Sequence, residues 1–224
     1  MPENTAQPYD PSAYPPVAVT VDLVLMSVVD GQLAVLLQRR SADPFAGKQA
    51  LPGSFVRPEE GLDDAARRVL ADKGGFADET DVWLEQLYSF GDPRRDPRMR
   101  IVSVAYFALL SPQRMAQALA TRDDLALVPL TDLEAPLAFD HAAIIALTHE
   151  RLKGKLDYIP LAFSLLPALF TLRDLQAVHE AILGTHLNKP AFRRRLLDTG
   201  WIEPTGEREA DTAFRPAELY RRRA

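Results

Sequence analysis

The chain has 224 residues, of which 47% are hydrophobic and 25% charged, and this composition suits one large or two small globular domains and excludes a disordered tail. Its 31 acidic and 26 basic side chains give a formal net charge of −5, which for the chain as a whole argues against a nucleic-acid binder. Because it contains no cysteine, disulfides, thiolate metal sites and thiol nucleophiles are excluded, and we expect a cytoplasmic location.

The N-terminal part of the chain predicts a flexible leader followed by a β-hairpin. Residues 1–16 are polar and rich in proline and lack the basic start and apolar centre of an export signal. The apolar run 17–29 is too short and too polar to cross a bilayer, so no membrane association is expected. It leads through Asp30 and Gly31, the pair typical of a type I′ turn, into a second apolar run at 33–37.

The remaining pattern up to residue 155 alternates between strands and helices. Strands are expected at 83–90, 101–110 and 125–128. Apolar residues recur at helical spacing in 62–70 and again after Asp140, the predicted cap of a second helix. The first domain, residues 17–155, is therefore predicted to be α+β with a mixed sheet.

After residue 155 strands become scarce, and the stretch 161–183 is helical in pattern, so we place a domain boundary at 156. The charge divides as well. Residues 1–150 hold 13 basic and 22 acidic side chains, a sum of −9, whereas residues 151–224 hold 13 basic and 9 acidic ones, a sum of +4. The second domain, 156–224, therefore differs from the first in its electrostatic character.

The segment from Gly53 to Gly74 has the spacing of a loop–helix–loop pyrophosphate site. Glu59 follows Gly53 by six residues, Arg67 follows eight later, and Gly74 follows seven later again. This resembles the Nudix box, whose pattern is Gly, five residues, Glu, seven residues, Arg-Glu, an aliphatic residue, any residue, Glu-Glu, any residue, Gly. The resemblance implies a Nudix-like α/β/α sandwich for the first domain.

The resemblance fails at the residues that would carry the chemistry. In the family, glutamates that follow the arginine hold divalent cations, and here those three positions are Arg68, Ala71 and Asp72. Glu59 and Arg67, which the resemblance assigns to holding the loop against the helix, both remain. We therefore expect a scaffold without a metal site and without catalytic residues. For Arg68 and Asp72 alone, an ordinary exposed helix pair stays an open alternative.

Four arginines between residues 94 and 100 precede the strand 101–110. Guanidinium groups bind phosphate oxygens in pairs, so this loop could hold a diphosphate without a metal. Residues 95–98 and 103–106 resemble a segment of Nudix proteins that recognise ADP-ribose, which implies that ligand as an effector and no cofactor. The candidate ligand contacts are Arg95, Arg98 and Arg100, with Arg39, Arg40 and Lys48 as secondary candidates. A solvated surface loop remains the alternative. The four histidines lack the spacing of a zinc site and receive no role.

The C-terminal part predicts a helix-turn-helix followed by a wing. Thr171 and Gly184 are the expected cap and terminator of one helix, and Asn188 and Gly200 those of the next. Residues 201–202 and 213–215 are predicted as the strands of a small hairpin. The second helix and the hairpin carry enough positive charge to bind DNA phosphates, and the candidate DNA contacts are Thr171, Lys189, Arg193, Arg194, Arg195, Arg208 and Arg215.

Segments 170–176, 192–197 and 215–220 resemble the winged helix of the Nudix-related transcriptional regulators of NAD metabolism. The sequence departs from that pattern at Pro190 and Ala191. The resemblance implies a homodimeric repressor of NAD biosynthesis and salvage genes that binds a palindromic DNA operator and releases it when ADP-ribose binds. Two alternatives stay open: a Mg²⁺-dependent Nudix hydrolase of ADP-ribose or a nucleotide sugar, and an interaction module whose basic tail docks on an acidic protein.

Overall fold

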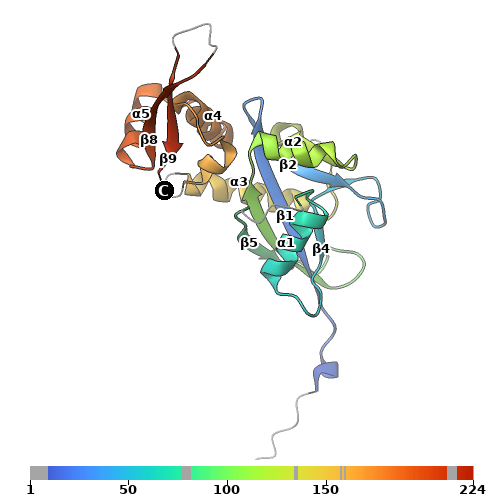
Figure 1. Cartoon of the computed structure of the whole chain (residues 1–224). Coiled ribbons are helices and arrows are strands. Elements are labelled where there is room, and N and C mark those ends of the chain that lie inside the picture. Colours follow the sequence, from blue (N-terminus) through green and yellow to red (C-terminus); the bar gives the residue numbers. More distant parts are fainter. Residues whose placement is uncertain are drawn as a thin grey trace, which may run out of the picture.

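A mixed β-sheet forms the centre of the N-terminal domain (Figure 1). The computed structural model describes residues 10–76, 82–133, 136–156, 158, 160–210 and 216–223, and these include seven strands of this sheet. The order is β3-β2-β1-β6-β5, while β4 also pairs with β1 and β7 with β2. The strands are β1 (Ala18–Val29), β2 (Gln32–Arg39), β3 (Gln49–Ala50), β4 (Gly53–Phe55), β5 (Glu85–Phe90), β6 (Ile101–Leu109) and β7 (Leu125–Pro129).

The predicted hairpin and the predicted mixed sheet are both confirmed. Asp30 and Gly31 have φ values of 50° and 75°, as a type I′ turn requires, and they join β1 to β2 in antiparallel register. β1 also pairs with β6 in parallel from Ala18 opposite Ile101 to Met26 opposite Leu109. β1 is therefore a central strand, buried along most of its length.

Helices cover both faces of the sheet. α1 (Leu62–Asp72) and α2 (Pro112–Ala120) bury their apolar residues against one face, and α3 (His141–Lys155) covers the other. α1 and α3 were predicted, whereas α2 was not. Its start carries a recognisable signal, because Ser111 caps the helix and Pro112 occupies its first turn.

A helix-turn-helix follows, as predicted. After the short helices η2 (Leu130–Asp132) and η3 (Leu161–Leu165) come α4 (Leu172–Leu183) and α5 (Lys189–Asp198). Thr171 caps α4 in a capping box with Asp174, and Gly184 ends it at φ 70°. The helical pattern of 161–183 is interrupted, because the backbone is not helical between η3 and α4, and α4 begins after Thr171, its predicted cap.

The wing differs from its prediction. β8 (Ile202–Arg208) pairs in antiparallel register with β9 (Glu218–Arg222), so the first strand runs through residues expected to form the tip. Pro204 and Gly206 read as strand breakers, but an edge strand tolerates proline, and the register shift between Pro204 and Arg208 accommodates them. The predicted second strand, 213–215, lies outside the described residues.

The wing is also tied to the first helix of the motif. Phe170, just before α4, and Tyr220 on β9 exchange two backbone hydrogen bonds of 3.0 and 2.8 Å. The wing and α4 therefore form one body.

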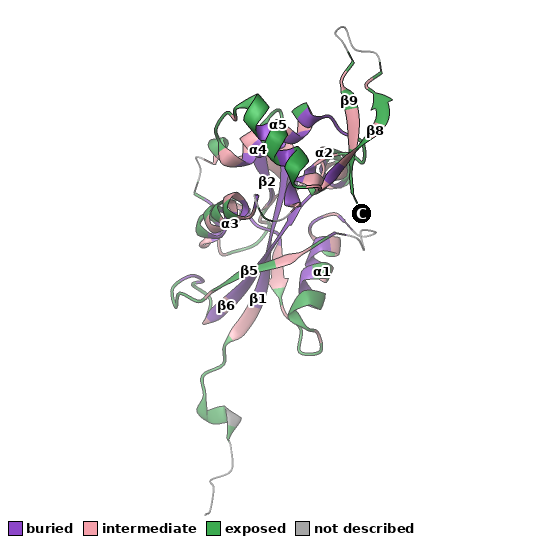
Figure 2. Ribbon diagram, turned by 90° about the vertical axis from the view of Figure 1, so that its left-hand side faces the viewer, coloured by how far each residue is buried: buried purple, intermediate pink, exposed green. Residues whose placement is uncertain are grey.

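One apolar core connects the two domains. It runs from the α3 face of the sheet through η3 into α4, α5 and β8, ending at Ile202. Figure 2 shows β1 and β6 buried along much of their length, whereas α5 exposes its outer face. The predicted boundary at 156 falls between α3 and η3, and residues 10–16 of the predicted leader include the short helix η1 (Pro11–Ala13).

Candidate functional site

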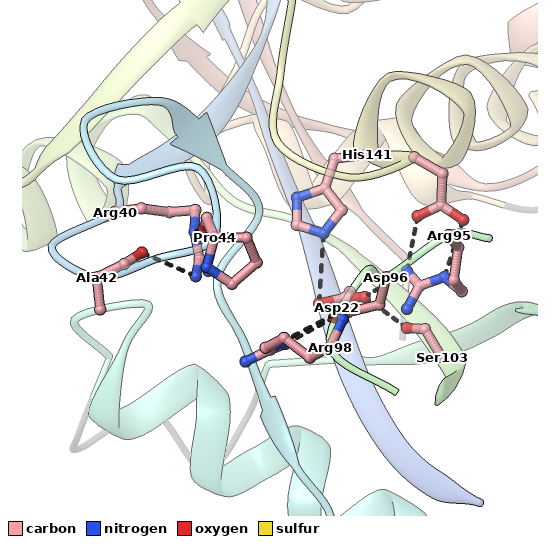
Figure 3. Close-up of polar contacts among 10 residues, drawn as sticks. Asp22, Arg40, Ala42, Pro44, Arg95, Asp96, Arg98, Ser103 and His141 are labelled. Carbon is pink, nitrogen blue, oxygen red and sulfur yellow. Dashed lines mark hydrogen bonds and ion pairs between the residues drawn. The ribbon is translucent and has the colours of Figure 1, made fainter. Parts of the chain in front are cut away.

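A cavity opens where the loop after β5, the N-terminus of α3 and the turn after β3 meet, and Figure 3 shows part of its polar lining. Charged, aromatic and small residues share this lining, and they come from separate parts of the first domain. They are Thr20, Asp22, Arg40, Leu51, Gly53, Ser54, Phe55, Lys73, Arg95, Asp96, Arg98, Phe139 and His141.

A buried polar network forms the floor of this cavity. Arg95 donates two hydrogen bonds to Asp140, of 2.7 and 2.9 Å, and one of 3.4 Å to Asp22. Ser103 donates its hydroxyl proton to the same Asp22 carboxylate at 2.5 Å. The Arg95 side chain is only 4% exposed. Arg95 therefore lines the predicted site, but its charge is neutralised by Asp22 and Asp140 within the protein.

His141 completes this floor. Its Nδ1 accepts the backbone N–H of Leu51 at 2.8 Å, and its Nε2 lies 3.8 Å from Asp22 Oδ1. Burial lowers the pKa of His141, so the imidazole is neutral near pH 7. Asp140 caps α3 as predicted, yet its carboxylate binds Arg95 rather than the helix N-terminus.

Asp22 and His141 were not predicted as site residues. The signal for Asp22 was visible, since an aspartate in the middle of an apolar strand must find partners. Asp22 also explains why residue 53 is a glycine, because a Cβ there would lie 2.1 Å from Asp22 Oδ1.

Arg98 and Arg40 flank the cavity mouth with aromatic rings. Arg98 makes two hydrogen bonds to Asp96, of 2.7 and 3.0 Å, and its guanidinium carbon lies 5.3 Å from the Phe55 ring centroid. Arg40 lies 4.8 Å from the Phe139 ring centroid. Of the candidate ligand contacts, Arg95, Arg98 and Arg40 thus line the cavity.

The other candidate ligand contacts lie elsewhere. Arg39 is exposed at the end of β2, and Lys48 lies 5.5 Å from the Phe45 ring centroid. Arg100 donates to the Gly91 carbonyl at 2.7 Å. None of these three side chains lines the cavity.

The ion pair that holds the loop against α1 lies one residue later in the sequence than predicted. Arg68 binds the Glu60 carboxylate through hydrogen bonds of 2.6 and 2.9 Å, whereas Glu59 and Arg67 are exposed. The prediction that Glu59 and Arg67 form this pair is wrong. α1 buries Ala65, Ala66, Val69 and Leu70, and this face directs the side chain of Arg68 toward the loop.

When the Nudix pattern is aligned on Glu60 and Arg68, one residue later than before, different residues occupy its three metal-binding carboxylate positions. They become Val69, Asp72 and Lys73, in place of Arg68, Ala71 and Asp72, and the terminal glycine becomes Gly75 in place of Gly74. Val69 is fully buried, Asp72 is exposed, and Lys73 reaches the cavity and donates to the Gly53 carbonyl at 2.5 Å.

This donor set does not suit a divalent cation, which requires clustered oxygen ligands. Within the described ranges, no three His, Asp or Glu side chains come together as a metal site.

A second group of candidate residues meets in the C-terminal domain. A groove between α4, α5 and the wing is lined by Thr171, Leu172, Arg173, Lys189, Arg193, Arg208, Ala217, Glu218 and Tyr220. It brings together four of the predicted DNA contacts, Thr171, Lys189, Arg193 and Arg208, and adds Arg173, which sequence reasoning missed. Arg173 pairs with Glu209 at 3.0 Å.

The remaining predicted DNA contacts fall outside this groove. Arg194 is exposed on α5. Arg195 lies 5.9 Å from the Phe192 ring centroid and lines a separate small pocket with Trp201. Arg215 lies outside the described residues.

Part of the positive charge of residues 151–224 belongs to the first domain. Arg151, Lys153 and Lys155 belong to α3, so residues 156–224 hold 10 basic and 9 acidic side chains, a sum of +1. The four cations that line the groove, Arg173, Lys189, Arg193 and Arg208, therefore belong to a domain that is nearly neutral as a whole. Within the described chain, no helix has the length and apolar character needed to cross a membrane.

Comparison with known proteins matches both parts of the chain. Residues 17–148 match the NUDIX domain model, and residues 162–222 match the NrtR DNA-binding winged helix domain model. The ADPR responsive transcriptional repressor NtrR of Acinetobacter baylyi is 40% identical over 95% of this chain and 85% of its own length.

Two solved structures are similar as well. Shewanella oneidensis NrtR in complex with a 27mer DNA is 39% identical with a TM-score of 0.80, covering 92% of this chain and 93% of its own. The NUDIX domain of the same protein in complex with ADP ribose is 39% identical with a TM-score of 0.54, covering 64% of this chain and 94% of its own.

Proposed function

The chain belongs to the NrtR family, in which a Nudix domain precedes a winged helix, and we propose on this basis that it is a repressor that binds operator DNA and releases it when ADP-ribose binds. The observation that carries the proposal is the presence of two separate sites. One is a cationic groove on the winged helix, and the other is a cavity with cations and aromatic rings in the Nudix domain. We expect the targets to be NAD biosynthesis and salvage genes and the location to be the cytoplasm.

The groove supplies the DNA contacts. Lys189 and Arg193 extend from α5, while Arg208 lies at the end of β8, so helix and wing approach one duplex together. The guanidinium and ammonium groups bind phosphates and position α5 over the major groove. A homodimer would present two such surfaces to a palindrome.

The cavity suits a nucleotide with a diphosphate. It offers Phe55, which is 42% exposed, and the Phe139 ring for stacking, together with several cations. The Thr20 hydroxyl also lines it, and among the described residues this is the buried side-chain oxygen without a hydrogen-bond partner. A ligand hydroxyl or phosphate would satisfy it, and no cofactor is needed.

α3 gives the two sites a physical connection. Its N-terminus contributes Asp140 and His141 to the cavity floor, and two turns later His149 Nε2 lies 2.7 Å from the Ile182 carbonyl of α4. A ligand that shifts the start of α3 therefore acts on α4. Such a ligand changes DNA affinity only through its different affinities for the two arrangements.

The same cavity supports a sensor rather than a hydrolase. Nudix hydrolysis requires clustered carboxylates for the metal, and Val69 and Lys73 occupy two of the three positions. We expect no AMP release from ADP-ribose in the presence of excess Mg²⁺ or Mn²⁺. Metal-dependent turnover would favour the hydrolase instead.

A mobility-shift titration tests the proposal. The full-length protein should retard a palindromic promoter fragment of an NAD gene, and millimolar ADP-ribose should release it, while adenosine at the same concentration should not. Failure to bind any such fragment, or binding that ADP-ribose leaves unchanged, contradicts the proposal.

A further inference from the structure

The cations that line the cavity fall into two groups. Arg95 and Arg98 are neutralised by aspartates, the first by Asp140 and Asp22 and the second by Asp96. Arg40 and Lys73 are held by backbone carbonyl groups instead. Within the described part of the chain, neither has a carboxylate oxygen within ion-pair distance.

The backbone contacts fix both cations in place. Arg40 donates through Nε to the Pro44 carbonyl at 2.8 Å and through Nη2 to the Ala42 carbonyl at 3.1 Å (Figure 3). Lys73 Nζ donates to the Gly53 carbonyl at 2.5 Å. An ammonium has three protons and a guanidinium five, so each retains donors for a ligand.

The two cations lie in an environment that disfavours their charge. Burial lowers the pKa of Lys73, and the positive charge of Arg40 lowers it further, against the opposing effect of Asp22. Burial and the neighbouring Arg98 lower the pKa of Arg40. An anion placed between them would relieve this unfavourable charge.

We propose, on the basis of the function proposed above, that Arg40 and Lys73 bind the diphosphate of the nucleotide directly and without a divalent cation. Lys73 stands at a position where the Nudix box has a metal-binding carboxylate, so a fixed ammonium supplies the positive charge at this position. Arg40 adds a planar group suited to two phosphate oxygens. Arg95 and Arg98, the arginines that the sequence favours, shape the site from within their own ion pairs.

Calorimetric titration of the full-length protein tests this assignment. ADP-ribose and inorganic pyrophosphate are each titrated in EDTA and in Mg²⁺ into wild type, Arg40→Gln, Lys73→Met and the control Arg57→Gln. Arg57 is exposed on the loop between β4 and α1 and does not line the cavity. Thermal unfolding of each variant verifies that it is folded.

We expect wild type to bind both ligands equally well in EDTA and in Mg²⁺. Arg40→Gln and Lys73→Met should each weaken binding about 10- to 100-fold, the range for a lost hydrogen bond between charged groups. Arg57→Gln should stay within about twofold of wild type, as expected for an exposed charge.

The outcomes separate this assignment from the proposed function. Pyrophosphate binding that depends on Arg40 and Lys73, without ADP-ribose binding, keeps the assignment and overturns the proposed ligand. ADP-ribose binding that requires Mg²⁺, or that both variants retain at wild-type strength, overturns the assignment and keeps the ligand. A wild-type protein that binds neither ligand overturns both. If Lys73→Met does not fold, Arg40→Gln and the EDTA comparison still decide the question.

Discussion

Arg95 illustrates how one side chain can be placed correctly by sequence and yet have a different role. Its guanidinium lies between two aspartates and is almost inaccessible to solvent. Removing it leaves the buried Asp22 carboxylate and the partly exposed Asp140 carboxylate without this cation.

Arg95→Met should therefore lower the free energy of unfolding by about 3 kcal/mol, the lower end of the range for breaking a buried ion pair. The matched control is Arg94→Met, because the Arg94 side chain is 92% exposed and should change stability by less than about 0.5 kcal/mol. Urea unfolding measures both. Equal stability of the two variants would show that Arg95 is not structural.

Glu60 makes the stability of the protein depend on pH in the acid range. The hydrogen bond from Arg68 lowers the pKa of Glu60 from 4.5 to about 2. A depressed folded-state pKa stabilises the protein above the unfolded pKa, and this contribution disappears as the pH falls from 4.5 toward 2. Glu60→Gln should flatten the fall in unfolding midpoint between pH 5 and pH 3, whereas Glu59→Gln should leave it unchanged. An unchanged pH dependence in Glu60→Gln would contradict this assignment.

At the scale of elements, much of the fold follows from local sequence. The Asp30-Gly31 turn and the caps at Thr171 and Asn188 each have a single preferred backbone conformation. The sequence therefore predicts the β1–β2 hairpin and the starts of α4 and α5. The pairing of Glu60 with Arg68 was not predicted, because it depends on how the loop before α1 meets the helix, and a motif that matches only in part does not fix that register to one residue. The cavity also depends on contacts distant in sequence, such as those of Asp22 with Arg95 and His141.

The three arginines of α5 differ in their surroundings. They are equivalent in sequence, but Arg193 lines the groove whereas Arg195 lies beside Phe192. The burial of Phe192 and Leu196, which their spacing of four residues predicts, fixes the rotation of α5 about its own axis, and this rotation separates the three arginines.

Arg193→Gln should therefore weaken DNA binding and reduce the slope of log K against log salt by about 1, the effect of losing one phosphate contact. Arg195→Gln should leave that slope unchanged. Mobility shifts at several salt concentrations provide the measurement. Equal slopes for the two variants would mean that α5 does not approach DNA through the groove.

At the scale of the whole molecule, the shared core joins the two domains. Leu152, Leu156 and Leu161 continue the sheet core into the winged helix, where it reaches Leu175 and Phe192. A winged helix cut from the chain would expose this apolar surface.

We therefore expect the full-length protein to unfold in one thermal transition, and the fragment 160–224 to lack a cooperative transition of its own. Differential scanning calorimetry measures both. Two resolved transitions for the whole chain would contradict the shared core as a source of cooperativity.

The two hydrogen bonds between Phe170 and Tyr220 have a further consequence. Because they fasten the wing to the start of α4, neither can tilt on the duplex without the other. In the dimer proposed above, each winged helix would then turn as one unit, and an effector would act by changing the angle between the two units. DNA affinity in that dimer would depend on whether the two winged helices match the helical repeat of the operator.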